Sequence, residues 1–291
     1  MRDKLESPPI SPRLRWLETL GSGVIELQRL TTQARILEAA NPGKPEVFHG
    51  FEYDFFERMN DLICGNLGWE TTHNADLPLR RDGDRFVYIG NHPTLTVAWP
   101  WGYFMSRHFA SNTVAVAKHS IIKNPLSRWA MGDLMLRAHK GIFINRDDRD
   151  QAMNTIEAET QAVLTPDTGA VFFPDAHRPY KRRIAKQVKD LGKAHPELQI
   201  GSWMTETCFP KSGGLWALMQ SIRDLIDVRF LDCTIVEPVP THTYGARLHF
   251  DVQEVSREEL LGTPESIEHL NGALVNLWKR KNRMIKDMRR L

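Results

Sequence analysis

Several features that identify common protein classes are scarce or missing in this sequence. It has only three cysteines in 291 residues, and no two of them form a CxxC pair. This pattern excludes a disulfide framework and the usual cysteine-based zinc site, and it favours a reducing compartment. The first residues lack the apolar core of a signal peptide, and no run of about 18 apolar residues predicts a membrane-spanning helix. We therefore expect any membrane contact to be peripheral.

A large excess of one charge is also missing, as are the common catalytic motifs. The formal net charge is +2, and no recognised binding motif accompanies the basic residues, so we expect no nucleic-acid partner. The chain holds no GxSxG elbow, no P-loop, no GxGxxG and no HExxH. These absences argue against the corresponding hydrolases, nucleotide-binding proteins and metalloproteases. The sequence predicts neither a metal site nor a bound cofactor.

The N-terminal part of the chain has a helical pattern. Between Pro12 and Ala40 apolar residues recur at helical spacing, which predicts one helix or two helices broken near Gly21 and Gly23. The apolar stripe has two interpretations, packing against the rest of the protein or apposition to a membrane. We expect residues 1–45 to form a tail and helical segment.

The remainder, residues 46–291, alternates between β-rich runs and helical stretches. This alternation is typical of an α/β fold, and we expect a mixed sheet flanked by helices. The predicted strands are residues 86–89, 113–116, 142–144, 170–173, 228–236 and 248–252. The predicted helices include residues 51–67, 125–138, 149–164 and 213–224.

Polar side chains of unusual type follow four of the predicted strands. In such sheets the ligand site gathers at the carboxyl ends of the strands. Their convergence predicts a cationic pocket with a titratable imidazole, suited to a phosphate-bearing substrate and a base-catalysed step. The residues at these strand ends are Asn91, His92, Lys118, His119, Arg146, Asp147, Asp175, His177 and Arg178.

These segments, in this order, resemble the sequence blocks of the glycerolipid acyltransferases, the family of 1-acylglycerol-3-phosphate acyltransferases. The resemblance spans roughly residues 85 to 255, and it rests on the order and spacing of the blocks. The family's blocks begin with Asn-His-x4-Asp and continue with a lysine after a strand, a glycine-to-arginine strand, a Phe-Pro-Glu-Gly-Thr-Arg-Ser segment, and a lysine and glycine before a proline-ended strand. The matching segments are 90–97, 117–118, 140–146, 173–179, 211–214 and 236–240.

The resemblance implies an enzyme with acyltransferase activity. It implies acyl transfer from acyl-CoA or acyl-carrier protein to a lysophospholipid or other glycerol phosphate acceptor, without an acyl-enzyme. His92 is then the general base, because imidazole suits proton transfer near neutral pH. Lys118, Arg146 and Arg178 would hold the acceptor phosphate, and backbone amides near the first or third block would stabilise the oxyanion. The other predicted substrate-binding residues are Asn91, His177 and Lys211.

One residue of the family's catalytic pair is missing, since Val97 stands where the family has aspartate. Thr96 lies four residues after His92, and on a helix begun by Pro93 its hydroxyl would share the histidine's face. Asp175 is the preferred replacement for the aspartate. The remaining candidates are Asp147 and Asp148. Two alternatives therefore stay open: a silent homologue that binds lipid or acyl carrier protein, and an acyltransferase with a non-glycerolipid acceptor.

Two stretches concentrate positive charge, residues 181–193 and residues 278–291. The second stretch also carries spaced apolar residues, so it could form a basic amphipathic helix on an anionic membrane. Both stretches could instead be solvated helix faces, or could bind an acidic carrier protein or the phosphates of CoA. The sequence predicts a cytoplasmic protein, with the inner membrane surface as a further location.

Overall fold

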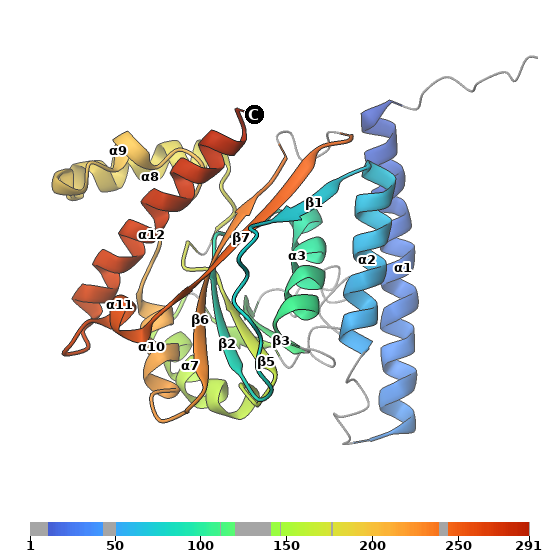
Figure 1. Ribbon diagram of the computed structural model, residues 1–291, viewed down its shortest axis with the longest axis horizontal. Coiled ribbons are helices and arrows are strands. Elements are labelled where there is room, and N and C mark those ends of the chain that lie inside the picture. Colours follow the sequence, from blue (N-terminus) through green and yellow to red (C-terminus); the bar gives the residue numbers. More distant parts are fainter. Residues whose placement is uncertain are drawn as a thin grey trace, which may run out of the picture.

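The structure, a computed structural model, is an α/β fold with one seven-stranded sheet and helices on both of its faces (Figure 1). The predicted fold class, including the N-terminal helical segment, is confirmed. The predicted helix at residues 125–138 lies outside the described part of the chain. The structure describes residues 11–42, 51–110, 112–119, 141–145, 147–175, 177–238 and 244–290.

The sheet has the strand order β1-β7-β6-β2-β5-β3-β4. The strands from β6 to β4 are mutually parallel, β7 is antiparallel to β6, and β1 is parallel to β7. The central strands are almost continuously apolar because helices cover both of their faces. The strands are β1 (Glu70–His73), β2 (Arg85–Gly90), β3 (Asn112–Lys118), β4 (Ile142–Ile144), β5 (Thr168–Phe172), β6 (Val228–Val236) and β7 (Arg247–Val255).

Two groups of helices cover the sheet, and a third, smaller group packs beside it (Figure 1). One face carries α1 (Pro12–Ala40), α2 (Phe51–Leu67) and α3 (Leu95–His108). The other face carries α7 (Arg149–Val163), α10 (Gly213–Ser221), α11 (Arg257–Leu261) and α12 (Ile267–Met288). The third group is α8 (Lys181–Ala194), the short 3-10 helix η3 (Pro196–Leu198) and α9 (Ile200–Trp203).

The N-terminal helix α1 runs unbroken through Gly21 and Gly23, which decides between the two predicted forms. Its buried residues Leu27, Leu30 and Ala34 belong to the same apolar core as α2, α3 and the sheet. The helix also exposes apolar residues to solvent. These are Leu14, Leu17, Leu20, Val24, Ile25 and Ile36. Among the described helices, none combines the length and apolar character required to cross a bilayer.

Candidate active site

The carboxyl ends of five neighbouring parallel strands lie at one edge of the sheet, as the sequence predicted. His92 follows β2, and Asp175 follows β5, the strand beside it. Lys118 ends β3, the next strand, while Arg146 lies outside the described residues. The topology therefore brings the predicted base, carboxylate and lysine to one edge of the sheet.

The imidazole of His92 is oriented partly by its own neighbourhood in the chain. Its Nδ1 lies 2.9 Å from the carbonyl oxygen of Pro93. Because a carbonyl oxygen can only accept, Nδ1 carries the proton in the neutral ring, and Nε2 is left as the basic nitrogen. The ring also packs against Phe173, with 4.9 Å between the ring centroids. These contacts fix both a tautomer and a ring position suited to proton abstraction.

The loop that carries His92 is held by two buried carboxylates. The N–H of His92 donates to Oδ2 of Asp175 over 3.0 Å, and the N–H of Thr94 donates to Oε1 of Glu237 over 2.5 Å. The carboxyl-bearing residues are 0% and 6% exposed, respectively. Pro93, between the two amides, has no N–H. The amides of His92 and Thr94 are thus engaged by carboxylates, and the expectation that first-block amides hold an oxyanion does not apply to these two.

The candidates for replacing the missing aspartate differ in their contacts with His92. Asp175 accepts the hydrogen bond from the main-chain N–H of His92 described above. The expectation of a helix begun by Pro93 is wrong, because α3 starts at Leu95 with Thr94 as its N-cap. His92 therefore precedes the helix, and the helical four-residue relation to Thr96 does not exist.

The other acids near this edge have separate partners. Asp148 caps α7 by accepting from the N–H of Gln151 at 3.0 Å. Asp147 is exposed and lies 4.0 Å from Nζ of Lys118. Val97, at the aspartate position of the family, is fully buried in the apolar core.

Asn91 has a clear part in building the strand end. Its side-chain amide donates to the carbonyl of Ile235 at 2.9 Å and accepts from the N–H of the same residue at 2.8 Å. Asn91 is buried, so the paired bonds bridge the ends of β2 and β6 in the protein interior. This bridge fixes the position of the residue that directly precedes His92.

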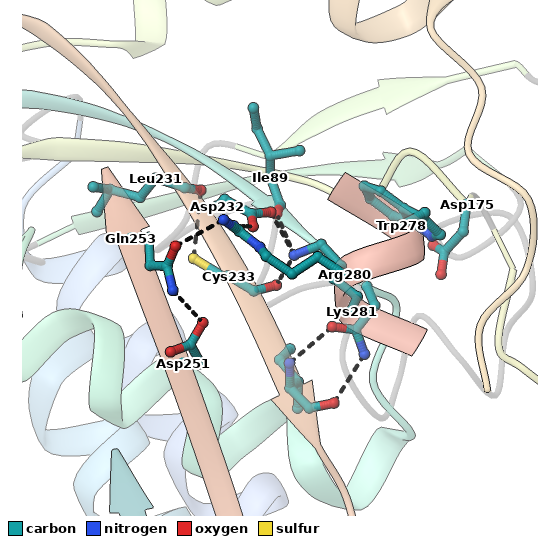
Figure 2. A network of polar contacts seen from close by, with 12 residues as sticks. Ile89, Asp175, Leu231, Asp232, Cys233, Asp251, Gln253, Trp278, Arg280 and Lys281 are labelled. Carbon is teal, nitrogen blue, oxygen red and sulfur yellow. Dashed lines mark hydrogen bonds and ion pairs between the residues drawn. The ribbon is translucent and has the colours of Figure 1, made fainter. Parts of the chain in front are cut away.

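A buried lysine supports the same strand end from α12 (Figure 2). Nζ of Lys281 donates to the carbonyls of Cys233 at 2.6 Å and Ile89 at 3.3 Å, and lies 2.5 Å from Oδ1 of Asp232. Figure 2 shows Arg280 reaching the same carboxylate of Asp232. Lys281 and Asp232 are both 0% exposed. Sequence reasoning missed this network, because it assigned the basic C-terminal stretch to the surface.

Glu237 was also missed, and its environment changes its ionisation. Burial raises the pKa of Glu237 to about 7, although the N–H of Thr94 and the positive charges of Arg289 and Arg178 oppose the shift. Arg289 also donates from Nε to the carbonyl oxygen of Glu237 over 3.3 Å. The available sequence signal was an acid directly before Pro238, where the strand of the fourth block ends.

The remaining predicted binding residues surround this edge. Arg178 is half-buried, and its Nε has no hydrogen-bond partner among the described residues. His177 is half-buried in the same segment after β5, and the side chain of Lys118 is 42% exposed. Lys211 is exposed, and its N–H donates to the carbonyl of Pro174 at 2.9 Å, which places its main chain beside the third block.

The site has no metal-ligand cluster in the part of the chain that the structure describes. No group of three or more histidine, cysteine, aspartate or glutamate side chains gathers there in an arrangement that could hold an ion. The groups that are present offer a basic imidazole, buried carboxylates and cations. Such a set can move a proton and bind an anion.

Comparisons with known proteins identify the family of this chain. The sequence model of the Acyltransferase family matches residues 71–236, which is more than half of the chain. The chain belongs to the Acyltransferase family, and it is an acyltransferase enzyme. No curated protein gives a significant match.

The fold is similar to that of a solved acyltransferase. The crystal structure of the 1-acyl-sn-glycerophosphate (LPA) acyltransferase PlsC from Thermotoga maritima matches with a TM-score of 0.54. The two sequences are 14% identical, and the match covers 94% of this chain and 98% of that one. At this identity the likeness concerns the fold.

Proposed function

We propose that this enzyme transfers an acyl group from acyl-CoA or acyl-carrier protein to a lysophospholipid or another glycerol phosphate acceptor, with His92 as the general base. The observation that carries the proposal is the geometry of His92. Its Nδ1 is engaged by the Pro93 carbonyl at 2.9 Å, at the end of β2 and within the range that the family model matches. Nε2 then receives the acceptor's hydroxyl proton.

The reaction needs only this one base in the protein. The acceptor oxygen attacks the thioester carbonyl carbon while Nε2 of His92 takes the hydroxyl proton. Collapse of the tetrahedral intermediate restores the carbonyl and breaks the carbon–sulfur bond. The departing thiolate takes the proton from the imidazolium, so the enzyme returns to its starting state without a covalent acyl-enzyme.

The proposed acceptor carries a phosphate because cations stand at the same edge. The buried Nε of Arg178 lacks a hydrogen-bond partner among the described residues, so it can donate to a phosphate oxygen. Lys118 ends the strand next to β5 and adds a second positive charge. The named activity of the Thermotoga protein, on 1-acyl-sn-glycerophosphate, is consistent with this acceptor class.

One observation favours a second candidate, a catalytically silent homologue that binds lipid or acyl carrier protein. Val97 is fully buried among apolar residues, so position 97 gives the imidazolium neither orientation nor charge. In the serine proteases, loss of the orienting aspartate's charge costs about 10⁴ in turnover. An acyltransferase with a non-glycerolipid acceptor would share the same base and differ in the phosphate-binding residues.

We also propose that the protein is cytoplasmic and makes peripheral contact with the inner membrane surface, through α1 rather than the C-terminus. Trp278 and Ile285 of α12 are buried against the domain, so they cannot insert into a bilayer. The exposed apolar residues of α1, such as Leu17, Val24 and Ile25, are the better candidates for lying on a lipid surface. Paired changes of Leu17 and Ile25 to serine should weaken binding to vesicles of anionic phospholipid. Truncation after Leu277 would instead disrupt the fold.

The test of the enzymatic proposal is thioester consumption with a panel of acceptors. The panel pairs phosphorylated glycerolipids with their dephosphorylated counterparts. His92→Ala should lower turnover by about 10²- to 10⁴-fold, the usual scale of general-base catalysis. His195→Ala is the control, because His195 is an exposed histidine paired with Glu197 on the surface. Wild-type turnover in His92→Ala would remove His92 from the mechanism, and no transfer to any acceptor would support the silent homologue.

A further inference from the structure

The short loop between β2 and α3 carries the backbone N–H groups of His92 and Thr94 on either side of Pro93, which has none. Each donates to a buried carboxylate, Asp175 for the first and Glu237 for the second. The carboxylates come from opposite sides, because Asp175 follows β5 and Glu237 follows β6, the two strands that flank β2. The loop is therefore held on both sides.

Glu237 is the part of this arrangement that the sequence resemblance does not explain. Asp175 corresponds to the acid of the third block, whereas the fourth block requires only a strand that ends in proline. Glu237 is nonetheless 6% exposed and accepts a 2.5 Å hydrogen bond at the start of α3. Burial of a carboxylate is costly unless a partner compensates for it, so the contact with the His92 loop is the feature that explains its position.

We infer that Glu237 is a positioning residue for His92, acting through its hydrogen bond to the N–H of Thr94 and supplying negative charge that Val97 does not. The inference rests on the proposed function, in which His92 is the general base. The carboxylate holds the end of the loop after His92, as Asp175 holds the main chain of His92 itself. Fixing the loop in this way limits the positions that the imidazole can sample.

The charge of Glu237 changes near neutral pH, because burial raises its pKa to about 7. The groups that act on it are Arg178 from the segment after β5 and Arg289 at the end of α12, together with the amide and the side chain of Thr94. Asp175, His92 and His177 are further titratable groups among the described residues of the loop and of the segment after β5. Only the deprotonated carboxylate is a charged acceptor, so full activity requires both Glu237 and His92 to be deprotonated. Protonation of Glu237 then adds a step to the acid side of log kcat/KM against pH, and the slope within that step exceeds one.

Three variants of the full-length enzyme separate these effects. Glu237→Gln keeps the size and an acceptor oxygen but removes the charge, and Glu237→Asp restores the charge on a shorter side chain. Thr94→Pro deletes the donor N–H, and the φ of −66° at Thr94 suits proline. It also deletes the Thr94 hydroxyl, which lowers the pKa of Glu237 as well, so Thr94→Val, which removes the hydroxyl and keeps the N–H, is its control. Circular dichroism and thermal unfolding establish that each variant is folded.

Glu237→Gln and Thr94→Pro should each lower kcat by about 10- to 100-fold, with KM for the acceptor changed less than about threefold. The double variant should be no slower than the slower single one, because both changes act on the same hydrogen bond, one through the charge of the acceptor and the other through the donor. The extra step on the acid side should disappear in Glu237→Gln, which leaves a slope of one, and should return in Glu237→Asp. Purely structural damage would not change the number of ionisations.

The inference is overturned if Glu237→Gln keeps kcat within about twofold of the wild type, or if the two single effects multiply in the double variant. If Glu237→Gln does not fold, Thr94→Pro decides, since wild-type kcat without the donor N–H also overturns it. His92→Ala separates this failure from that of the proposed function. An inactive His92→Ala beside a fully active Glu237→Gln removes only the role of Glu237, while an active His92→Ala removes the base itself.

Discussion

The two halves of the candidate site differ in how firmly their residues are held. Around β2 and the start of α3, the carboxyl-bearing residues Asp175 and Glu237 are 0% and 6% exposed and bind the main chain beside His92. Around β3 and β4, the side chains of Lys118 and Asp147 are 42% and 82% exposed and lie 4.0 Å apart. A base must meet its proton within hydrogen-bonding distance, whereas a cation attracts a phosphate over a longer range. The difference matches those separate requirements.

The largest effect should come from placing an acid at position 97 in the buried half. Val97 belongs to the apolar core that also contains Tyr88 and Trp101, and the described members of this core carry no charge that could pair with a carboxylate at position 97. Val97→Asp should therefore lower the free energy of unfolding by about 5 kcal/mol, as expected for an uncompensated buried charge. Turnover should not increase.

Urea denaturation and a turnover assay test this prediction. Val97→Ala is the control, because it removes apolar volume without adding charge and should cost about 2 kcal/mol. A stable Val97→Asp enzyme with faster turnover would show that position 97 reaches the imidazole. That result would contradict the difference between the buried half of the site, around β2 and α3, and the exposed half, around β3 and β4.

A second change removes support from beneath the strand end. Lys281→Met leaves Asp232 buried with Arg280 as its remaining partner, and it leaves the carbonyls of Ile89 and Cys233 without the ammonium. We expect a loss of about 3 kcal/mol in the free energy of unfolding, at the low end for a broken buried pair because Arg280 remains. Lys286→Met, at an exposed position of the same helix, should change it by less than about 0.5 kcal/mol. Equal effects of the two changes would contradict the role of the network.

The pH dependence of stability distinguishes Glu237 from a surface acid. Between its ordinary pKa of 4.5 and its folded-state pKa of about 7, the folded protein holds a proton that the unfolded chain has released. The stability of the wild type therefore falls as pH rises through this window. Glu237→Gln carries no such proton, so its stability relative to the wild type should increase by up to about 3 kcal/mol between pH 4.5 and pH 8.

Glu254 provides a control of opposite sign. A hydrogen bond from Arg229 lowers the pKa of Glu254, so its contribution to stability is present above its ordinary pKa and is lost as pH falls. Glu254→Gln should thus become less stable relative to the wild type as pH rises to the ordinary pKa of 4.5, and should show little trend above it. Urea denaturation at pH 5 and pH 8 measures the trend of Glu237→Gln, and denaturation at about pH 3 and pH 5 measures that of Glu254→Gln. The same trend in both variants would contradict the assignment of a raised pKa to Glu237.

Local pattern was sufficient to predict most of the fold. The helix at residues 51–67 and the strand at residues 228–236 have the bounds that periodicity and β-rich composition indicated. The placement of His92, Asp175 and Lys118 at one edge of the sheet followed from the rule that parallel strands gather their carboxyl ends. The strand β1 was missed because Glu70–His73 is polar and mostly exposed at the edge of the sheet, so it has no apolar alternation.

The contacts that position the base were beyond local reasoning because they join distant parts of the chain. Glu237 meets Thr94 across 143 residues, and Lys281 meets the carbonyl of Ile89 across 192. Trp278 and Lys281 belong to a stretch rich in basic residues, and such a stretch predicts an exposed helix. In the structure α12 packs on β6, and both residues are buried. The buried lysine is tolerable only because Asp232 offers it a carboxylate, and the sequence does not reveal that pairing.

The smallest predicted effects concern Arg178 and Lys118, the two cations expected to bind the acceptor phosphate. They test how far an exposed cation contributes to substrate binding. Arg178→Ala should raise KM for a phosphorylated acceptor about tenfold, because its partly buried guanidinium can donate more than one hydrogen bond to a phosphate. Lys118→Ala should raise KM for the phosphorylated acceptor only about threefold, since an exposed ammonium attracts the phosphate through solvent.

Raising the salt concentration from about 0.05 M to about 0.5 M should remove most of the Lys118 effect and less of the Arg178 effect, because screening acts mainly on exposed charges. Arg178→Lys is the matched control, which keeps the charge but loses the fork of donors, so it should recover only part of the affinity. An equal rise in KM for the dephosphorylated acceptor would show that Arg178 supports the structure instead, for example through Glu237, whose pKa its charge lowers.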